Sequence, residues 1–194
     1  VYLLINHEPE NDGPGTDQQW EESAGPHWRA SQRRFAKVIA DLDDDRCHLV
    51  LCHMEFTNRS PNRTMNGWNP AWDGDMPQYV RERTVVGPDG YQALNSVGNF
   101  VGGAAGAPQP RFSSFFDYYR DYGFTRMAVS ENALYNNQGA PVNTVADRIT
   151  DGIAPMIRNL NLEYYAYFEA WGPNIQYGGF LDSPERVAAF AAIA

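Results

Sequence analysis

The feature that most constrains the fold of this chain is the alternation of short apolar runs with segments of helical character. Apolar runs of this length predict buried strands, because strands of parallel sheets are covered on both faces and are continuously hydrophobic. The runs cover residues 2–5, 48–54, 84–87, 126–130 and 164–168. Segments with helical spacing or capping signals cover residues 26–42, 113–122, 145–160 and 184–194. About five strand–helix units predict a parallel sheet covered by helices.

A sheet of this kind fits one α/β domain in a chain of 194 residues. Five parallel strands suit either an open doubly wound sheet or part of a (β/α)8 barrel, and a whole barrel typically needs about 250 residues. The sequence opens directly in the apolar run Val1-Tyr2-Leu3-Leu4-Ile5, without an initiator Met. We therefore expect a piece of a longer protein, in which residues 1–194 supply strands four to eight of a barrel as one domain.

Local signals add detail to this arrangement. In the first predicted helix, the apolar residues that spacing places largely on one face are Trp28, Phe35, Val38, Ile39 and Leu42. Gly123 is expected to stop the helix over residues 113–122. Residues 55–82 are expected to form a long functional loop that holds Trp68 and Trp72, and residues 102–110 a flexible connector.

The charge balance narrows the class of partner. The net charge is −9, and close basic pairs occur only at Arg33-Arg34 and at Arg81 with Arg83. A surface that follows a phosphate backbone needs clustered Lys and Arg, so we expect no nucleic-acid partner. No run of about 18 apolar residues is present, so we expect no membrane insertion. A neutral polymer is compatible with this composition.

The two cysteines do not suggest a disulfide. Cys47 and Cys52 are five positions apart, and on one strand an odd spacing points two side chains to opposite faces. We therefore expect free thiols.

Chemistry-bearing residues gather where the predicted strands end. In parallel α/β folds the reactive side chains lie at the carboxyl ends of the strands. The five ends read Asn6-His7-Glu8-Pro9-Glu10, His53-Met54-Glu55, Asp89-Gly90-Tyr91, Ser130-Glu131-Asn132 and Glu169-Ala170-Trp171. Glu8 and Glu131 each follow an apolar strand, and a pair of carboxyl groups across one rim suits glycoside hydrolysis.

Four of these strand ends resemble a known family in the same order along the chain. Residues 5–11, Ile-Asn-His-Glu-Pro-Glu-Asn, resemble the strand-four motif of the clan A (β/α)8 glycoside hydrolases and are closest to glycoside hydrolase family 26, the β-mannanase-like family. Residues 126–131 resemble the strand-seven motif, residues 86–91 the strand-six segment and residues 165–171 strand eight. Strands one to three of that barrel have no counterpart in this chain.

The resemblance implies the role of each residue. Glu131 would be the nucleophile and Glu8 the acid/base of a retaining, double-displacement hydrolase that cleaves a β-linked polysaccharide by endo action. Asn6 and His7 would position the acid or bind a hydroxyl group. Tyr91, Trp171, Trp68 and Trp72 would contact or stack on sugar rings. We expect no cofactor or metal ion, and a secreted or extracellular location, whether free, on a cell surface or on a virion.

Two alternatives remain open at this stage. The first is a catalytically silent barrel that serves as a carbohydrate-binding or structural module of a larger surface or virion assembly, with the missing strands supplied by the rest of its own barrel or by another chain. The second is an open-sheet hydrolase with Glu8 and Glu10 as metal ligands. No Cys or His falls at zinc spacing, and neither a nucleophile elbow nor a phosphate-binding loop is present.

Overall fold

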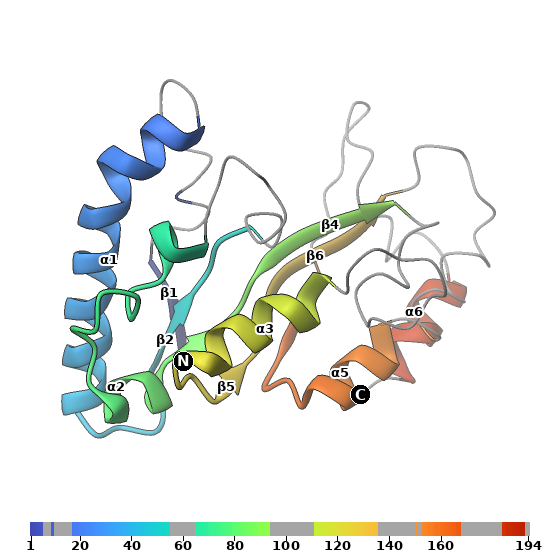
Figure 1. The fold of residues 1–194 in the computed structure, drawn as a ribbon. Coiled ribbons are helices and arrows are strands. Elements are labelled where there is room, and N and C mark those ends of the chain that lie inside the picture. Colours follow the sequence, from blue (N-terminus) through green and yellow to red (C-terminus); the bar gives the residue numbers. More distant parts are fainter. Residues whose placement is uncertain are drawn as a thin grey trace.

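The computed structural model describes residues 1–5, 9, 17–54, 65–93, 111–135, 150, 153–167 and 184–192. Its strands are β1 (Tyr2–Leu4), β2 (His48–Leu51), β3 (Val85–Val86), β4 (Asp89–Ala93), β5 (Arg126–Met127), β6 (Val129–Tyr135) and β7 (Tyr165–Tyr167). Its helices are α1 (Asp17–Asp41), the 3-10 helix η3 (Met65–Trp68), α2 (Gln78–Arg83), α3 (Arg111–Asp121), α5 (Ala154–Leu160) and α6 (Pro184–Ala191). Figure 1 shows α1 beside β1 and β2, and α3 in front of β4 and β6.

All described strand pairings are parallel, and their order in space follows their order along the chain. One sheet has the order β1-β2-β3-β5 and the other β4-β6-β7. The two sheets continue each other, because β4 follows β3 after residues 87–88 and β6 follows β5 after Ala128. A doubly wound sheet reverses its strand order at a switch point, and the described strands show no reversal. The predicted parallel α/β arrangement is confirmed.

The sheet is curved, because a side chain of its first strand reaches side chains beside its last strand. Laid flat, β1 and β7 would be separated by four spacings of about 4.8 Å, or roughly 19 Å. The rings of Tyr2 in β1 and Tyr164, just before β7, instead lie with their centroids 4.5 Å apart. The Tyr2 hydroxyl also donates to Glu163 Oε2 at 3.2 Å. The side chains on the concave face therefore meet across the interior of the curved sheet.

A polar network ties the amino ends of these strands together. Arg126 of β5 donates from Nη2 to Glu163 Oε2 at 2.7 Å and from Nη1 to His48 Nδ1 at 2.8 Å. Since His48 Nδ1 accepts this bond, the ring is neutral. Burial first, and then the neighbouring guanidinium, lower the pKa of His48. With the Tyr2–Glu163 bond, the network joins β1, β2, β5 and the turn before β7.

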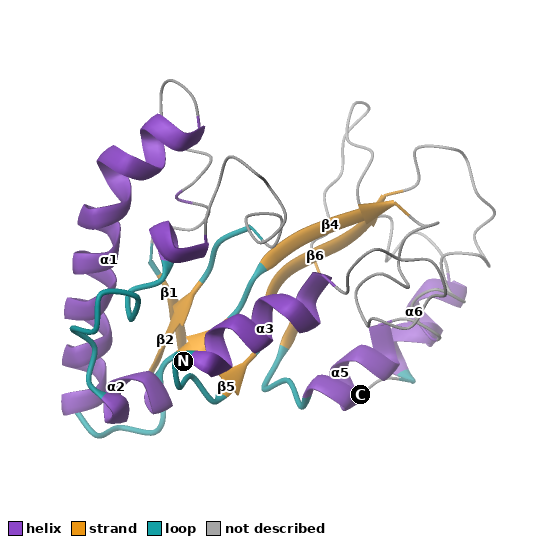
Figure 2. Cartoon of the chain, viewed as in Figure 1, coloured by secondary structure: helices purple, strands orange, loops and turns teal. Residues whose placement is uncertain are grey.

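The two faces of the sheet pack differently. Alternate residues of a strand point to opposite faces, and Leu49 and Leu51 pack on the helix side while Val50 between them joins a small second cluster with Val85 and Ala128. The concave face carries small side chains. A Cβ atom on Gly87 would lie 2.3 Å from Ser130 Oγ, so this position requires glycine. Figure 2 shows the strands as a band with the helices beside and in front of it.

Helix α1 differs from its predicted extent and from its predicted buried face. It starts at Asp17, nine residues before the expected start at Pro26, which now lies inside the helix. Trp28 and Ile39 are buried as expected, whereas Phe35, Val38 and Leu42 are 40%, 54% and 66% exposed. The buried stripe is completed by Gln32, Ala36 and Ala40. The predicted apolar face of this helix was wrong. The small residues Ala36 and Ala40 are buried against the rest of the protein, whereas the larger side chain of Val38 points to solvent.

Other local predictions have mixed outcomes. Gly123 ends α3 with φ +84°, as expected. The predicted loop over 55–82 contains η3 and α2, and the strand predicted over 84–87 resumes as β4, so Asp89 and Tyr91 lie within a strand. Residues 102–110 lie outside the described part of the chain.

Cys47 and Cys52 are free thiols, as predicted. None of the described helices is both long and apolar enough to cross a bilayer.

Two neighbouring residues of α1 test the corrected face of this helix. Ile39 is 8% exposed and Val38 is 54% exposed. Ile39→Ala removes buried methyl groups and is expected to lower the free energy of unfolding by about 2–4 kcal/mol. Val38→Ala is expected to change it by less than about 1 kcal/mol, because the side chain is solvated and Ala favours helix. Urea denaturation of both variants measures the difference. Equal losses would contradict the assigned face.

Candidate functional site

The candidate site lies where the neighbouring strands β4 and β6 begin to pair. Met54, just after β2, forms a parallel bridge with Asp89 of β4. Asp89 is in turn in register with Glu131 of β6. Residues in register on neighbouring strands lie about 4.8 Å apart along the hydrogen-bonding direction. The backbone pairing therefore makes two carboxylate-bearing residues, Asp89 and Glu131, immediate neighbours.

The residues on either side of Glu131 are held by tyrosines that flank or begin β7. Ser130 Oγ and the Tyr164 hydroxyl lie 2.9 Å apart, and burial, the larger effect, raises the pKa of Tyr164 to about 12. Asn132 is fully buried, donates to the Gly90 carbonyl and accepts from the Tyr165 hydroxyl. Glu131 itself is half-buried. These contacts fix the backbone on both sides of Glu131 while the carboxylate stays partly accessible.

Asp89 is a residue of this site that sequence analysis did not single out. It is fully buried in β4, and its backbone N–H donates to the His53 carbonyl at 3.1 Å. The sequence placed Asp89 at the end of a predicted strand, in Asp89-Gly90-Tyr91, and gave it no role. The sequence feature that could have identified Asp89 is Gly87-Pro88, which interrupts the strand between β3 and β4. Carboxyl groups on neighbouring strands are the residue type that acid–base and nucleophilic hydrolysis use.

The predicted site residues have different outcomes. Glu131 lies at the candidate site. The backbone of Tyr91 pairs with Ala133, and its side chain lies outside the described part. Trp68 is 1% exposed and belongs to the hydrophobic core, so it has no free face for a sugar ring. Trp72 is 48% exposed and lies beside α1, where Arg29 covers its ring. The remaining predicted residues, Asn6, His7, Glu8 and Trp171, and Glu10 of the metal alternative, lie outside the described residues.

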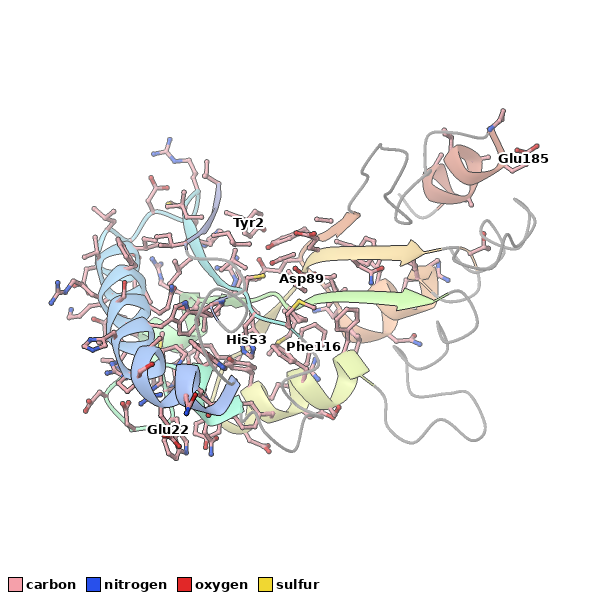
Figure 3. The ribbon with its side chains drawn as sticks, turned by 90° about the horizontal axis from the view of Figure 1, so that it is seen from above. Tyr2, Glu22, His53, Asp89, Phe116 and Glu185 are labelled. Atoms are coloured by element: carbon pink, nitrogen blue, oxygen red, sulfur yellow. The ribbon has the colours of Figure 1, made fainter. Side chains whose placement is uncertain are left out.

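His53 is a structural residue in spite of its place at a strand end. It is fully buried against Phe115, with ring centroids 4.8 Å apart, and its Nε2 lies 2.6 Å from the Tyr119 hydroxyl. That hydroxyl also lies 3.3 Å from the Trp68 carbonyl oxygen, to which it can donate, and the tautomer of His53 sets which group donates in the His53–Tyr119 bond. Burial lowers the pKa of His53 to about 3. The neutral ring therefore links the segment after β2 through Tyr119 of α3 to η3, and Figure 3 labels His53 together with Phe116 of α3.

Within the described residues, no group of three or more His, Cys, Asp or Glu side chains is arranged to hold a metal ion.

Comparison with known proteins gives a remote structural likeness. Neither the protein-family models nor the curated proteins match the sequence. A solved structure, described as the high-resolution structure of XacCel5A in complex with cellopentaose, is similar over 100% of this chain and 73% of that chain, with 12% sequence identity and a TM-score of 0.46. The function proposed next therefore rests on the arrangement of the described residues and on the sequence motifs.

The burial of His53 predicts how stability depends on pH. Its folded-state pKa of about 3 lies below the ordinary value of about 6.5, so the folded state favours the neutral ring. The resulting stability is complete above about pH 6.5 and is lost as the pH falls toward 3, by up to roughly 1.4 kcal/mol per pH unit. His53→Gln keeps a donor amide and does not titrate. Its stability deficit relative to the unsubstituted protein should therefore shrink between pH 6 and 4 in urea denaturation. A deficit that stays constant over that range would contradict a neutral, buried His53.

Proposed function

We propose that this chain is the carboxyl-terminal part of a (β/α)8 barrel and acts as a retaining glycoside hydrolase on a β-linked polysaccharide outside the cell. Glu131 is the proposed nucleophile and Glu8 the proposed acid/base. The observation that carries the proposal is the curved, chain-ordered parallel sheet, in which Tyr2 at one edge touches Tyr164 at the other. In such a sheet the carboxyl ends of β1 and β6 belong to one rim, and Glu8 follows β1 by four residues.

The surroundings of Glu131 suit a nucleophile. A nucleophilic carboxylate must be held in one orientation and still be reached by the anomeric carbon of the substrate. Hydrogen bonds of Ser130 with Tyr164 and of Asn132 with Tyr165 fix the strand on both sides of Glu131. Glu131 as a residue is half-buried, which is compatible with contact to a substrate. The buried Asp89 on the neighbouring strand supplies a second carboxyl group beside it.

The proposed reaction has two steps. In the first, a carboxylate oxygen of Glu131 attacks the anomeric carbon, the glycosidic C–O bond breaks, and Glu8 gives its proton to the leaving oxygen. In the second, Glu8 takes a proton from water, the water oxygen attacks the anomeric carbon, and the bond to Glu131 breaks. Asn6, His7, Tyr91 and Trp171 remain the predicted sugar contacts at this rim.

The proposal is tested by substituting the two glutamates. Glu131→Ala is expected to abolish hydrolysis of β-mannan, xylan and β-glucan substrates, since no covalent intermediate can form. Glu8→Gln is expected to lower kcat by about 10²–10⁴-fold, the usual contribution of general acid–base catalysis. Glu82→Ala is the matched control, because Glu82 is an exposed glutamate of α2. Circular dichroism of each variant shows whether the fold is retained.

The stereochemistry of the first product separates the mechanisms. ¹H NMR of the reaction at early times should show the same anomeric configuration in product and substrate. The opposite configuration would contradict double displacement. If the unsubstituted protein binds the polysaccharides and hydrolyses none of them, the carbohydrate-binding or structural module takes the place of the enzyme.

A further inference from the structure

A second site lies at the contact between α1 and the segment that begins at η3. Here α1 and the segment from η3 to residue 73 enclose a cavity of about 250 Å³. It is smaller than the roughly 300–1,000 Å³ pockets that hold drug-sized molecules, so it suits one ring. Its lining residues are Glu21, Glu22, Pro26, Arg29, Gly67 and Trp72.

Two glycines allow α1 and η3 to approach closely enough to form this cavity. A Cβ atom on Gly25 of α1 would lie 2.9 Å from the Gly67 carbonyl oxygen. A Cβ atom on Gly67 would lie 2.3 Å from the Glu21 side chain. Arg29 closes the contact by donating from Nη1 to the Gly67 carbonyl at 2.8 Å. The cavity wall is therefore a packed helix contact.

Arg29 also orients the aromatic wall of the cavity. Its guanidinium carbon lies 5.7 Å from the centroid of the Trp72 ring, and its Nε lies 3.8 Å from Asp73 Oδ2. Trp72 is nevertheless 48% exposed. One cation thus already occupies the cation–π position at this ring, and part of the indole surface stays open to solvent.

The charges of the lining exclude most classes of ligand. A cation would have to compete with Arg29 for Trp72 and would be repelled by its guanidinium. An anion would meet the carboxylates of Glu21 and Glu22. A neutral ring with an apolar face and hydroxyl groups fits all three features, since its C–H face packs on indole, its hydroxyl groups donate to carboxylate oxygens, and the guanidinium donates to its oxygens.

The cavity is separate from the candidate catalytic site. Its residues belong to α1 and to the segment that begins at η3, whereas Asp89 and Glu131 belong to strands of the sheet. Figure 3 shows Glu22 at one end of α1 and Asp89 in the middle of the molecule.

We propose that this cavity binds one sugar residue of a neutral polysaccharide chain, with Trp72 as the stacking surface and Glu22 and Arg29 as the hydrogen-bonding groups. The site would hold the polymer against the outside of the protein, apart from the rim where cleavage is proposed. This inference does not depend on Glu131 being catalytic, because a silent barrel with the same cavity would bind the same ligand.

The test follows the indole N–H signal of Trp72 in two-dimensional ¹H–¹⁵N NMR, assigned with the Trp72→Phe variant. The probes are soluble β-linked gluco-, manno- and xylo-oligosaccharides at millimolar concentration. At least one is expected to shift the Trp72 signal in a saturable manner. Glu22→Gln should raise Kd roughly tenfold, as expected for a weakened charge-assisted hydrogen bond. Tyr79→Ala, which removes another exposed aromatic at the far end of α1, should leave Kd unchanged.

The Glu131→Ala variant separates this site from the proposed catalytic one. The Trp72 shift is expected to persist with the same Kd in that variant, whether or not the unsubstituted protein hydrolyses any substrate. The proposal is overturned if no oligosaccharide moves the Trp72 signal, if only a cationic probe such as choline moves it, or if Glu131→Ala abolishes the shift.

Discussion

The architecture depends on the contact between Tyr2 and Tyr164 on the concave side of the sheet. Their ring centroids lie 4.5 Å apart although they belong to opposite edges of a five-stranded arrangement. The network centred on Arg126, which binds Glu163 and His48, joins the amino ends of the same strands. Small residues on the concave face, and Gly87 where a Cβ atom would meet Ser130, leave room for this curvature. Because the strands are parallel, curvature at their amino ends also directs their carboxyl ends toward one rim.

The proposed catalytic and sugar-binding sites use this framework in different ways. Glu131 lies on a strand whose neighbouring residues, Ser130 and Asn132, are bonded to Tyr164 and Tyr165. The backbone position of Glu131 is therefore held by Tyr164 and Tyr165, and Tyr164 is also the residue that contacts Tyr2. The Trp72 cavity instead depends on the packing of α1 against η3. The buried, neutral His53 links the two regions, because it bonds through the Tyr119 hydroxyl to the Trp68 carbonyl of η3.

The sequence predicted the strands and the parallel arrangement because continuous apolar runs are a strong signal of buried strands. Gly123 marked the end of α3 for an equally direct reason, since glycine adopts a positive φ without strain. The failures occurred where tertiary packing decides the outcome. Periodicity could not show that Ala36 and Ala40, rather than Phe35 and Val38, make the close contacts of α1.

Sequence spacing was limited in the same way for the candidate functional site, because it does not show tertiary packing. Spacing placed Glu131 just after a strand that ends at Ser130, whereas β6 continues to Tyr135 and Glu131 lies within it. It could not separate the core residue Trp68 from the exposed Trp72, because both follow the same strand within one polar segment. Nor could it show that the strand resumes as β4 after Pro88 and that Asp89 is buried there.

The most direct test of the account is the distance between the carboxyl groups of Glu8 and Glu131 in a crystal structure of this chain. The retaining mechanism predicts about 5–5.5 Å across an open groove. A separation of roughly 6.5–9.5 Å would indicate inversion, and carboxyl groups on different faces of the sheet would contradict the proposed enzyme.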